Sequence, residues 1–168
     1  MVTLCHYCSG LIFMRDVVRG AGTYMAVLIV LFGSLLLYRG LGAMGVGALQ
    51  TWLACARFAL ATMFVFTAMA HFASPRNDLI AMVPPSFPRP DLLVTITGVL
   101  EFAGAIGLLL VPTRPWAAWG LILLLLAMLP ANISAAQRGV LLRGHAATPL
   151  WVRIPLQALF ILWTWWVR

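Results

Sequence analysis

Five apolar runs, each about as long as a membrane is thick, constrain the fold of this chain more than any other feature. A helix needs about 20 mainly apolar residues to cross the hydrocarbon core of a bilayer. Backbone polar groups find no water there, so a spanning segment must satisfy its own hydrogen bonds. The sequence therefore predicts several membrane-spanning helices, at about residues 21–38, 51–73, 91–111, 115–133 and 149–167.

The composition indicates the same class of protein. Of the 168 residues, 63% are hydrophobic and 9% are charged, whereas soluble domains carry about 25% charged residues. All eleven basic residues are arginines, and most of them stand singly at the ends of the apolar runs. This pattern is typical of membrane-flanking anchors. We therefore expect the lipid bilayer as a partner and, despite the net charge of +7, no nucleic acid.

The chain divides into an N-terminal extension, residues 1–50, and a membrane domain, residues 51–168. The domain is predicted to be a four-helix bundle, and the extension adds one transmembrane helix at about 21–38, so the fold class is all-α. A signal peptide is the alternative for the first run, but the segment ahead of it is long for one. Short connections predict antiparallel neighbours. We expect a multi-pass protein of the bacterial inner membrane.

Four polar residues inside the apolar runs matter most: Arg57, His71, Glu101 and Asn132. Glu101 is the only glutamate of the chain, and a carboxylate at mid-depth costs several kcal/mol unless it is paired, protonated or hydrated. At 1.5 Å per residue, Arg57 and Glu101 differ in depth by about 6 Å, which predicts an ion pair. His71 and Asn132 share a level, while His71 and Glu101 are about 12 Å apart in depth.

Two interpretations of these residues stay open. In the first they form a proton or small-molecule site, with Glu101 and His71 as candidate catalytic groups and Arg57 and Asn132 as candidate substrate-binding groups. In the second, Arg57–Glu101 is a structural ion pair and His71–Asn132 an interhelical clamp. The catalytic assignment is unknown on either interpretation.

The cysteines and a proline-rich segment are each explained by local structure. Cys5 and Cys8 form a C-x-x-C pattern around His6, but no βαβ unit surrounds it and zinc needs more ligands, so we expect no metal or bound cofactor there. Cys55 is expected to be a small packing residue. The segment 80–92 has four prolines between positions 84 and 90, which predicts a stiff, extended, non-helical connection.

Several short motifs, in this order, resemble the DoxX family of small membrane proteins. They are Arg57 on a helix ending in A-H-F (70–72), M-V-P-P (82–85), T-G-V-L-E (97–101) and L-P-A-N (129–132). The resemblance covers about residues 51–167. It implies a four-helix bundle with Arg57, His71, Glu101 and Asn132 at the family's characteristic polar positions.

The resemblance also implies a function. Members of that family are linked to membrane oxidoreductases that pass electrons to quinone and to assemblies that handle thiols. We therefore expect a small subunit or membrane anchor of a quinone- or thiol-linked oxidoreductase system, with quinone as the candidate cofactor and a membrane or soluble redox protein as partner. The alternative is a non-enzymatic scaffold or a transport-like binding protein. Whether the chain is an enzyme, and its oligomeric state, stay open.

Overall fold

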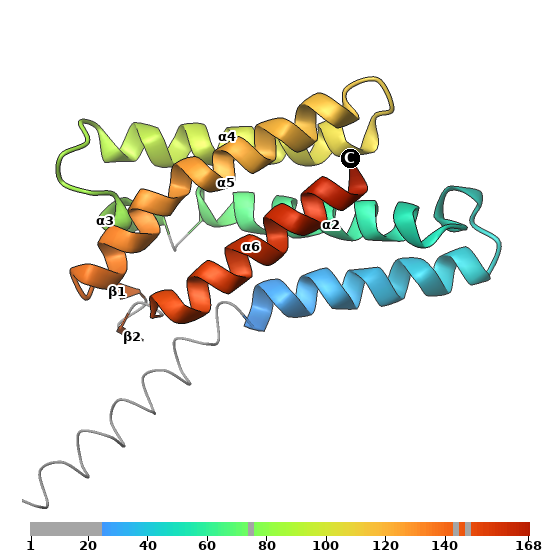
Figure 1. Ribbon diagram of the computed structural model, residues 1–168, viewed down its shortest axis with the longest axis horizontal. Coiled ribbons are helices and arrows are strands. Elements are labelled where there is room, and N and C mark those ends of the chain that lie inside the picture. The colour runs from blue at the N-terminus through green and yellow to red at the C-terminus, as the bar shows by residue number, and fades with distance from the viewer. Residues whose placement is uncertain (1–24, 74–75, 143–144, 147–148) are drawn as a thin grey trace, which may run out of the picture.

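The computed structural model describes residues 25–73, 76–142, 145–146 and 149–168 and confirms an all-α membrane fold (Figure 1). Within these ranges, five helices are long and apolar enough to cross a membrane, so the protein is a multi-pass membrane protein. The helices are the N-terminal helix Met25–Ala43, the 3-10 helix η1 (Gly47–Leu49), α2 (Trp52–Ala70), α3 (Arg76–Met82), α4 (Pro90–Leu109), α5 (Arg114–Gln137) and α6 (Leu150–Val167). Two strands of two residues each, β1 (Leu141–Leu142) and β2 (His145–Ala146), pair antiparallel before α6.

The four helices of the predicted membrane domain form a closed ring. Helix α2 packs against α4, α4 against α5, α5 against α6, and α6 returns to α2. The centre of the ring holds fully buried side chains such as Phe64, Leu60, Leu108 and Leu121. Large apolar side chains such as Trp116 and Leu162 stay exposed on the outside, as expected where lipid replaces water.

The N-terminal helix belongs to the bundle. It runs to Ala43 rather than ending near residue 38, and it lies beside α2 and α6 (Figure 1). Leu31 is fully buried, the Phe32 ring meets Trp163 edge-on at 5.6 Å, and the Tyr38 hydroxyl lies 2.8 Å from Thr62 Oγ1. Residues 1–24, with Cys5 and Cys8, lie outside the described residues.

The prediction of an extended, non-helical segment 80–92 is wrong at both ends. Helix α3 continues to Met82, and α4 already begins at Pro90. The proline ring fixes a helical φ and lacks an N–H, which costs nothing in the first turn of a helix, so Pro90 starts α4 instead of breaking it. Only residues 83–89, between the two helices, are non-helical. The last of them, Arg89, has a positive φ of 54° and directly precedes α4.

Arginine side chains hold the carboxyl ends of several helices. The last carbonyl groups of a helix have no partner within it, and lipid offers no water to replace one. A guanidinium group supplies several donors and favours the negative end of the helix dipole. The bonds are Arg76 Nη1 to His71 O (2.8 Å), Arg57 Nε to Val167 O (3.0 Å), Arg114 Nε to Leu108 O (3.2 Å), and Arg138 Nη2 to Ala81 O, Met82 O and Val83 O (2.8–3.0 Å).

Replacing Arg138 by glutamine is expected to lower the free energy of unfolding by about 1–3 kcal/mol, because the carbonyl groups at the end of α3 lose a charged donor. The measurement is unfolding in mixed micelles of a neutral detergent and dodecyl sulfate. Arg89→Gln is the control, since Arg89 is exposed like Arg138 but makes no side-chain hydrogen bond to the residues that the structure describes, and it should change stability little. An equal loss in both variants would show that only surface charge matters.

Candidate functional site

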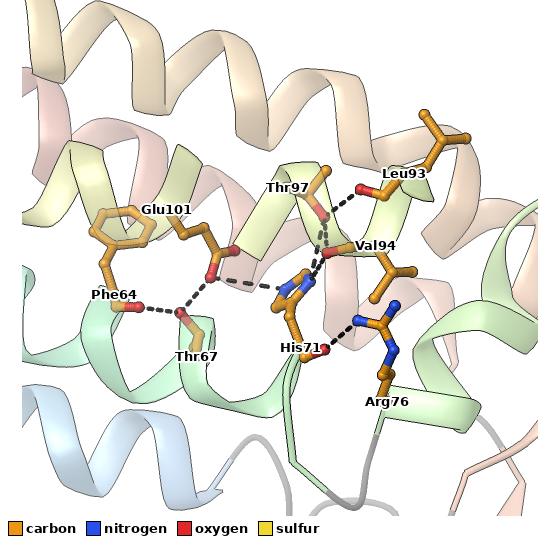
Figure 2. A network of polar contacts seen from close by, with 8 residues as sticks. All are labelled: Phe64, Thr67, His71, Arg76, Leu93, Val94, Thr97 and Glu101. Carbon is orange, nitrogen blue, oxygen red and sulfur yellow. Dashed lines mark hydrogen bonds and ion pairs between the residues drawn. The ribbon is translucent and has the colours of Figure 1, made fainter. Parts of the chain in front are cut away.

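Of the four polar residues singled out in the sequence, the structure brings His71 and Glu101 together and leaves the other two elsewhere. His71 follows the last turn of α2, and Glu101 lies in the middle of α4. Both are buried, with 5% and 4% of their surface exposed. His71 Nε2 lies 3.8 Å from Glu101 Oε2 (Figure 2). The depth difference of about 12 Å estimated from the sequence is therefore wrong.

The offset between α2 and α4 explains the error. The depth estimate started both helices at one level, but His71 Nδ1 contacts the carbonyl oxygen of Val94, so α4 begins about one turn beyond the end of α2. Side chains also lean toward the amino end of their own helix. Because α2 and α4 are antiparallel, His71 and Glu101 lean toward each other, which closes the remaining gap.

The hydrogen bonds of His71 fix which ring nitrogen faces the carboxyl group. The distance from Nδ1 to Val94 O is 2.8 Å, and a carbonyl oxygen can only accept, so Nδ1 carries hydrogen. A neutral ring then presents the lone pair of Nε2 to Glu101. The 3.8 Å separation exceeds a hydrogen bond, so a small side-chain movement or a water molecule must complete a proton transfer. The arrangement offers one proton two binding positions, on the ring or on the carboxyl group.

Thr67 links the pair to the backbone of α2. Its Oγ1 lies 2.9 Å from Glu101 Oε2 and 3.0 Å from Phe64 O, and the two bonds are visible in Figure 2. A hydroxyl has one hydrogen to donate but can also accept. Thr67 can donate to an ionised Glu101, or donate to Phe64 and accept from a protonated Glu101. The surroundings of Glu101 therefore accommodate both protonation states.

Two further features surround the His71–Glu101 pair: a close contact between α2 and α4 at Gly98, and the side chain of Arg76. Gly98 of α4 faces His71 so closely that a Cβ there would lie 2.5 Å from His71 Cβ. On the outer side, Arg76 donates to His71 O, to Asp91 O at 3.1 Å and to Thr95 Oγ1 at 2.9 Å. Arg76 thereby joins the end of α2, the start of α3 and the first turns of α4 above the buried pair.

Arg57 does not pair with Glu101, so the predicted ion pair is wrong. Its Nε donates to Val167 O at the end of α6. Glu101 instead contacts Thr67, which lies ten residues after Arg57, or about 15 Å along α2. Arg57 lies in the second turn of α2, where α6 ends, and its guanidinium group binds the free carbonyl group there.

Asn132 does not meet His71, so the predicted clamp between them is also wrong. Asn132 Oδ1 accepts from Arg153 Nη1 at 3.0 Å, and its amide lies 3.2 Å from Gln157 Oε1. Gln157 Nε2 donates to Leu125 O, near the kink expected at Pro130. This second cluster joins α5 to α6 rather than α5 to α2.

Sequence reasoning missed Arg153 and Gln157. Both are buried, with 3% and 7% of their surface exposed. They stand four residues apart on α6, a spacing that puts both on one helix face. Two polar residues at that spacing in an apolar run are the signal that would have found them.

Metal-binding and cysteine chemistry have little support in the described part of the chain. No group of three His, Cys, Asp or Glu side chains there is placed to hold a metal ion. Cys55 is buried and its thiol donates to Leu49 O at 3.2 Å, in agreement with a packing role. Two cavities, of about 210 and 710 Å³, lie elsewhere in the bundle, and neither is lined by His71 or Glu101.

Comparison with known protein families matches residues 60–168 to a domain of unknown function (DUF8561). The match covers more than half of the chain and falls within the predicted membrane domain, residues 51–168. No curated protein and no solved structure matches the chain.

Proposed function

The chain belongs to the DUF8561 family, and we propose that it handles protons within the membrane. In this proposal the His71–Glu101 pair takes up and releases one proton. The protein serves as a small subunit or membrane anchor of a quinone- or thiol-linked oxidoreductase system in a bacterial inner membrane.

The proton-handling part of the proposal rests on one observation, the buried His71–Glu101 pair and the Thr67 hydroxyl beside it. Nε2 of His71 and Oε2 of Glu101 lie 3.8 Å apart, and Thr67 can donate to or accept from the carboxyl group. A carboxyl group inside a membrane helix is costly, and such groups commonly form proton relays. The Thr67 hydroxyl therefore suits a carboxyl group that changes its protonation state.

The redox part of the proposal rests on the sequence resemblance to the DoxX family. We propose that this chain is related to that family. The two cavities described above are lined by neither His71 nor Glu101. We therefore assign the pair to moving protons, while a partner protein or quinone dissolved in the lipid would carry the electrons.

The alternative is a scaffold without enzymatic function, and one observation favours it. Arg57 and Asn132, two of the four singled-out residues, make bonds that join helices and satisfy backbone groups. If His71 and Glu101 acted in the same way, the protein would bind partners or small molecules without moving protons.

Glu101→Gln separates the two functions, because glutamine keeps the shape of glutamate but cannot release a proton. In the wild-type protein reconstituted in vesicles, we expect pH-difference infrared spectra to contain the signal of a buried carboxyl group. The signal should vanish in Glu101→Gln. Membranes with this variant should reduce an added short-chain quinone, with a thiol as donor, about a hundredfold more slowly.

Asp91→Asn is the matched control, since it removes a carboxyl group from the first turn of α4 rather than from the buried pair. It should keep both the infrared signal and the reduction rate. Full activity of Glu101→Gln at unchanged expression would refute the proposal in favour of the scaffold.

A further inference from the structure

Three arginines gather at the end of the bundle opposite the His71 end. Arg57 and Arg114 lie close enough for their charges to interact. Arg168 follows Val167, whose carbonyl group Arg57 holds, and its guanidinium group stacks on Trp165 at 3.5 Å from the ring centre. Arg57 and Arg114 each use Nε to bind a helix end. Their Nη groups make no hydrogen bond to other residues that the structure describes.

Acidic side chains do not offset this positive charge in the described ranges. Asp78 lies in α3 and Asp91 in the first turn of α4, both at the opposite end of the bundle. Glu101 is enclosed with Thr67 and His71. A cluster of like charges at a membrane surface is stabilised by an anion, and anionic lipid attracts each surface arginine by about 1 kcal/mol.

A groove of about 710 Å³ between α4 and α5 starts beside Arg114. Thr113 and Trp116 line it at this end, and Leu100 and Ala127 at the other. Thr113 to Ala127 is fourteen residues, or about 21 Å of helix, which is more than half of the hydrocarbon thickness. The lining side chains are almost all apolar, and a Cβ added at Gly120 would meet nothing within 4 Å.

The shape of the groove suits an acyl chain. Its lining runs for about 21 Å along α5, and small residues such as Gly104, Gly107 and Gly120 line it. A hydrocarbon chain, with carbon contacts at about 4 Å, is thin enough to lie inside.

We propose that this surface binds one phospholipid with an anionic head group. The phosphate group lies between the Nη groups of Arg114 and Arg57, and an acyl chain fills the groove down to the level of Leu100. Trp116, which is 78% exposed, borders the groove at the depth where tryptophan favours lipid head groups. This site is separate from the His71–Glu101 pair and does not depend on its function.

Native mass spectrometry of the full chain in a neutral detergent tests the proposal, with phosphatidylglycerol and phosphatidylcholine as probes. We expect the anionic lipid to bind more tightly. Gly120→Leu should weaken its binding by about tenfold, because the new side chain fills part of the groove and removes van der Waals contacts between the acyl chain and the protein. Arg114→Gln should weaken it by about fivefold, the equivalent of one surface charge.

Gly33→Leu is the matched control, because a Cβ at Gly33 of the N-terminal helix also meets nothing within 4 Å. It should leave lipid binding unchanged. Since Arg114 also holds Leu108 O, Arg114→Gln can fail to fold, whereas Gly120→Leu tests the groove without that risk. Equal binding of both lipids, displacement by inorganic phosphate, or a change in oligomeric state rather than lipid binding in Gly120→Leu would each overturn the proposal.

Discussion

A methyl group at position 98 is expected to destabilise the bundle more than a methyl group at position 104, although both would meet an atom at 2.5 Å. At Gly98 the obstacle is His71 Cβ, which is fixed to the backbone. At Gly104 it is Leu121 Cδ2, the tip of a flexible side chain. Gly98→Ala must therefore push α2 away from α4, at a cost of about 1–3 kcal/mol.

The series Gly98→Ala, Gly104→Ala and Gly120→Ala separates this effect from helix propensity. All three variants gain propensity, up to about 1 kcal/mol, on replacing glycine by alanine. Gly120→Ala should be neutral or stabilising, since nothing lies within 4 Å, and Gly104→Ala should fall between the other two. Unfolding in mixed micelles gives the free energies. Equal values for Gly98→Ala and Gly104→Ala would show that His71 can move aside.

The second expected result is a coupling energy between His71 and Glu101. Contacting polar residues that share partners couple by about 0.5–3 kcal/mol in double-mutant cycles. The single variants His71→Ala and Glu101→Ala each leave the other group buried beside fewer partners, at about 1–3 kcal/mol. The double variant should therefore lose less than the sum of the two.

A cycle between Arg57 and Glu101 is the control, and it also tests the ion pair that the sequence predicted. The two residues share no partner, and about 15 Å of helix α2 separates Arg57 from the Glu101 contact at Thr67. Their effects should add within about 0.5 kcal/mol. Strong coupling in this cycle, with none between His71 and Glu101, would reverse the pairing described above.

Both candidate catalytic residues, Glu101 and His71, were recognisable from the sequence because they are ionisable residues in apolar runs. A carboxyl group and an imidazole in apolar runs are costly wherever the helices pack, so burial alone marks Glu101 and His71. Their mutual contact was not predictable. It depends on Thr67 and Val94 as partners, and these residues carry no signal of their own in the sequence.

The predicted partners of Arg57 and Asn132 were wrong for a related reason. A guanidinium group takes the strongest acceptor within reach, and for Arg57 that acceptor is a backbone carbonyl group, Val167 O. Every helix end has such carbonyl groups, so the sequence pattern does not indicate which of them an arginine will bind. Asn132 similarly contacts Arg153 and Gln157 on α6. In the ring α5 packs between α4 and α6 rather than beside α2, which leads to His71.

The sequence by itself determined the class of protein, the number of membrane-spanning helices and the burial of Glu101 and His71. These follow from run length and from the cost of polar groups in lipid, which do not depend on which helices become neighbours. The tertiary structure alone decided which polar residues meet. Partner choice depends on the axial offset of neighbouring helices, and here α3 and the following turn let α4 start one turn beyond α2. An error of one turn, about 5.4 Å, exceeds the length of a hydrogen bond, so depth counting cannot choose between Arg57 and His71 as the partner of Glu101.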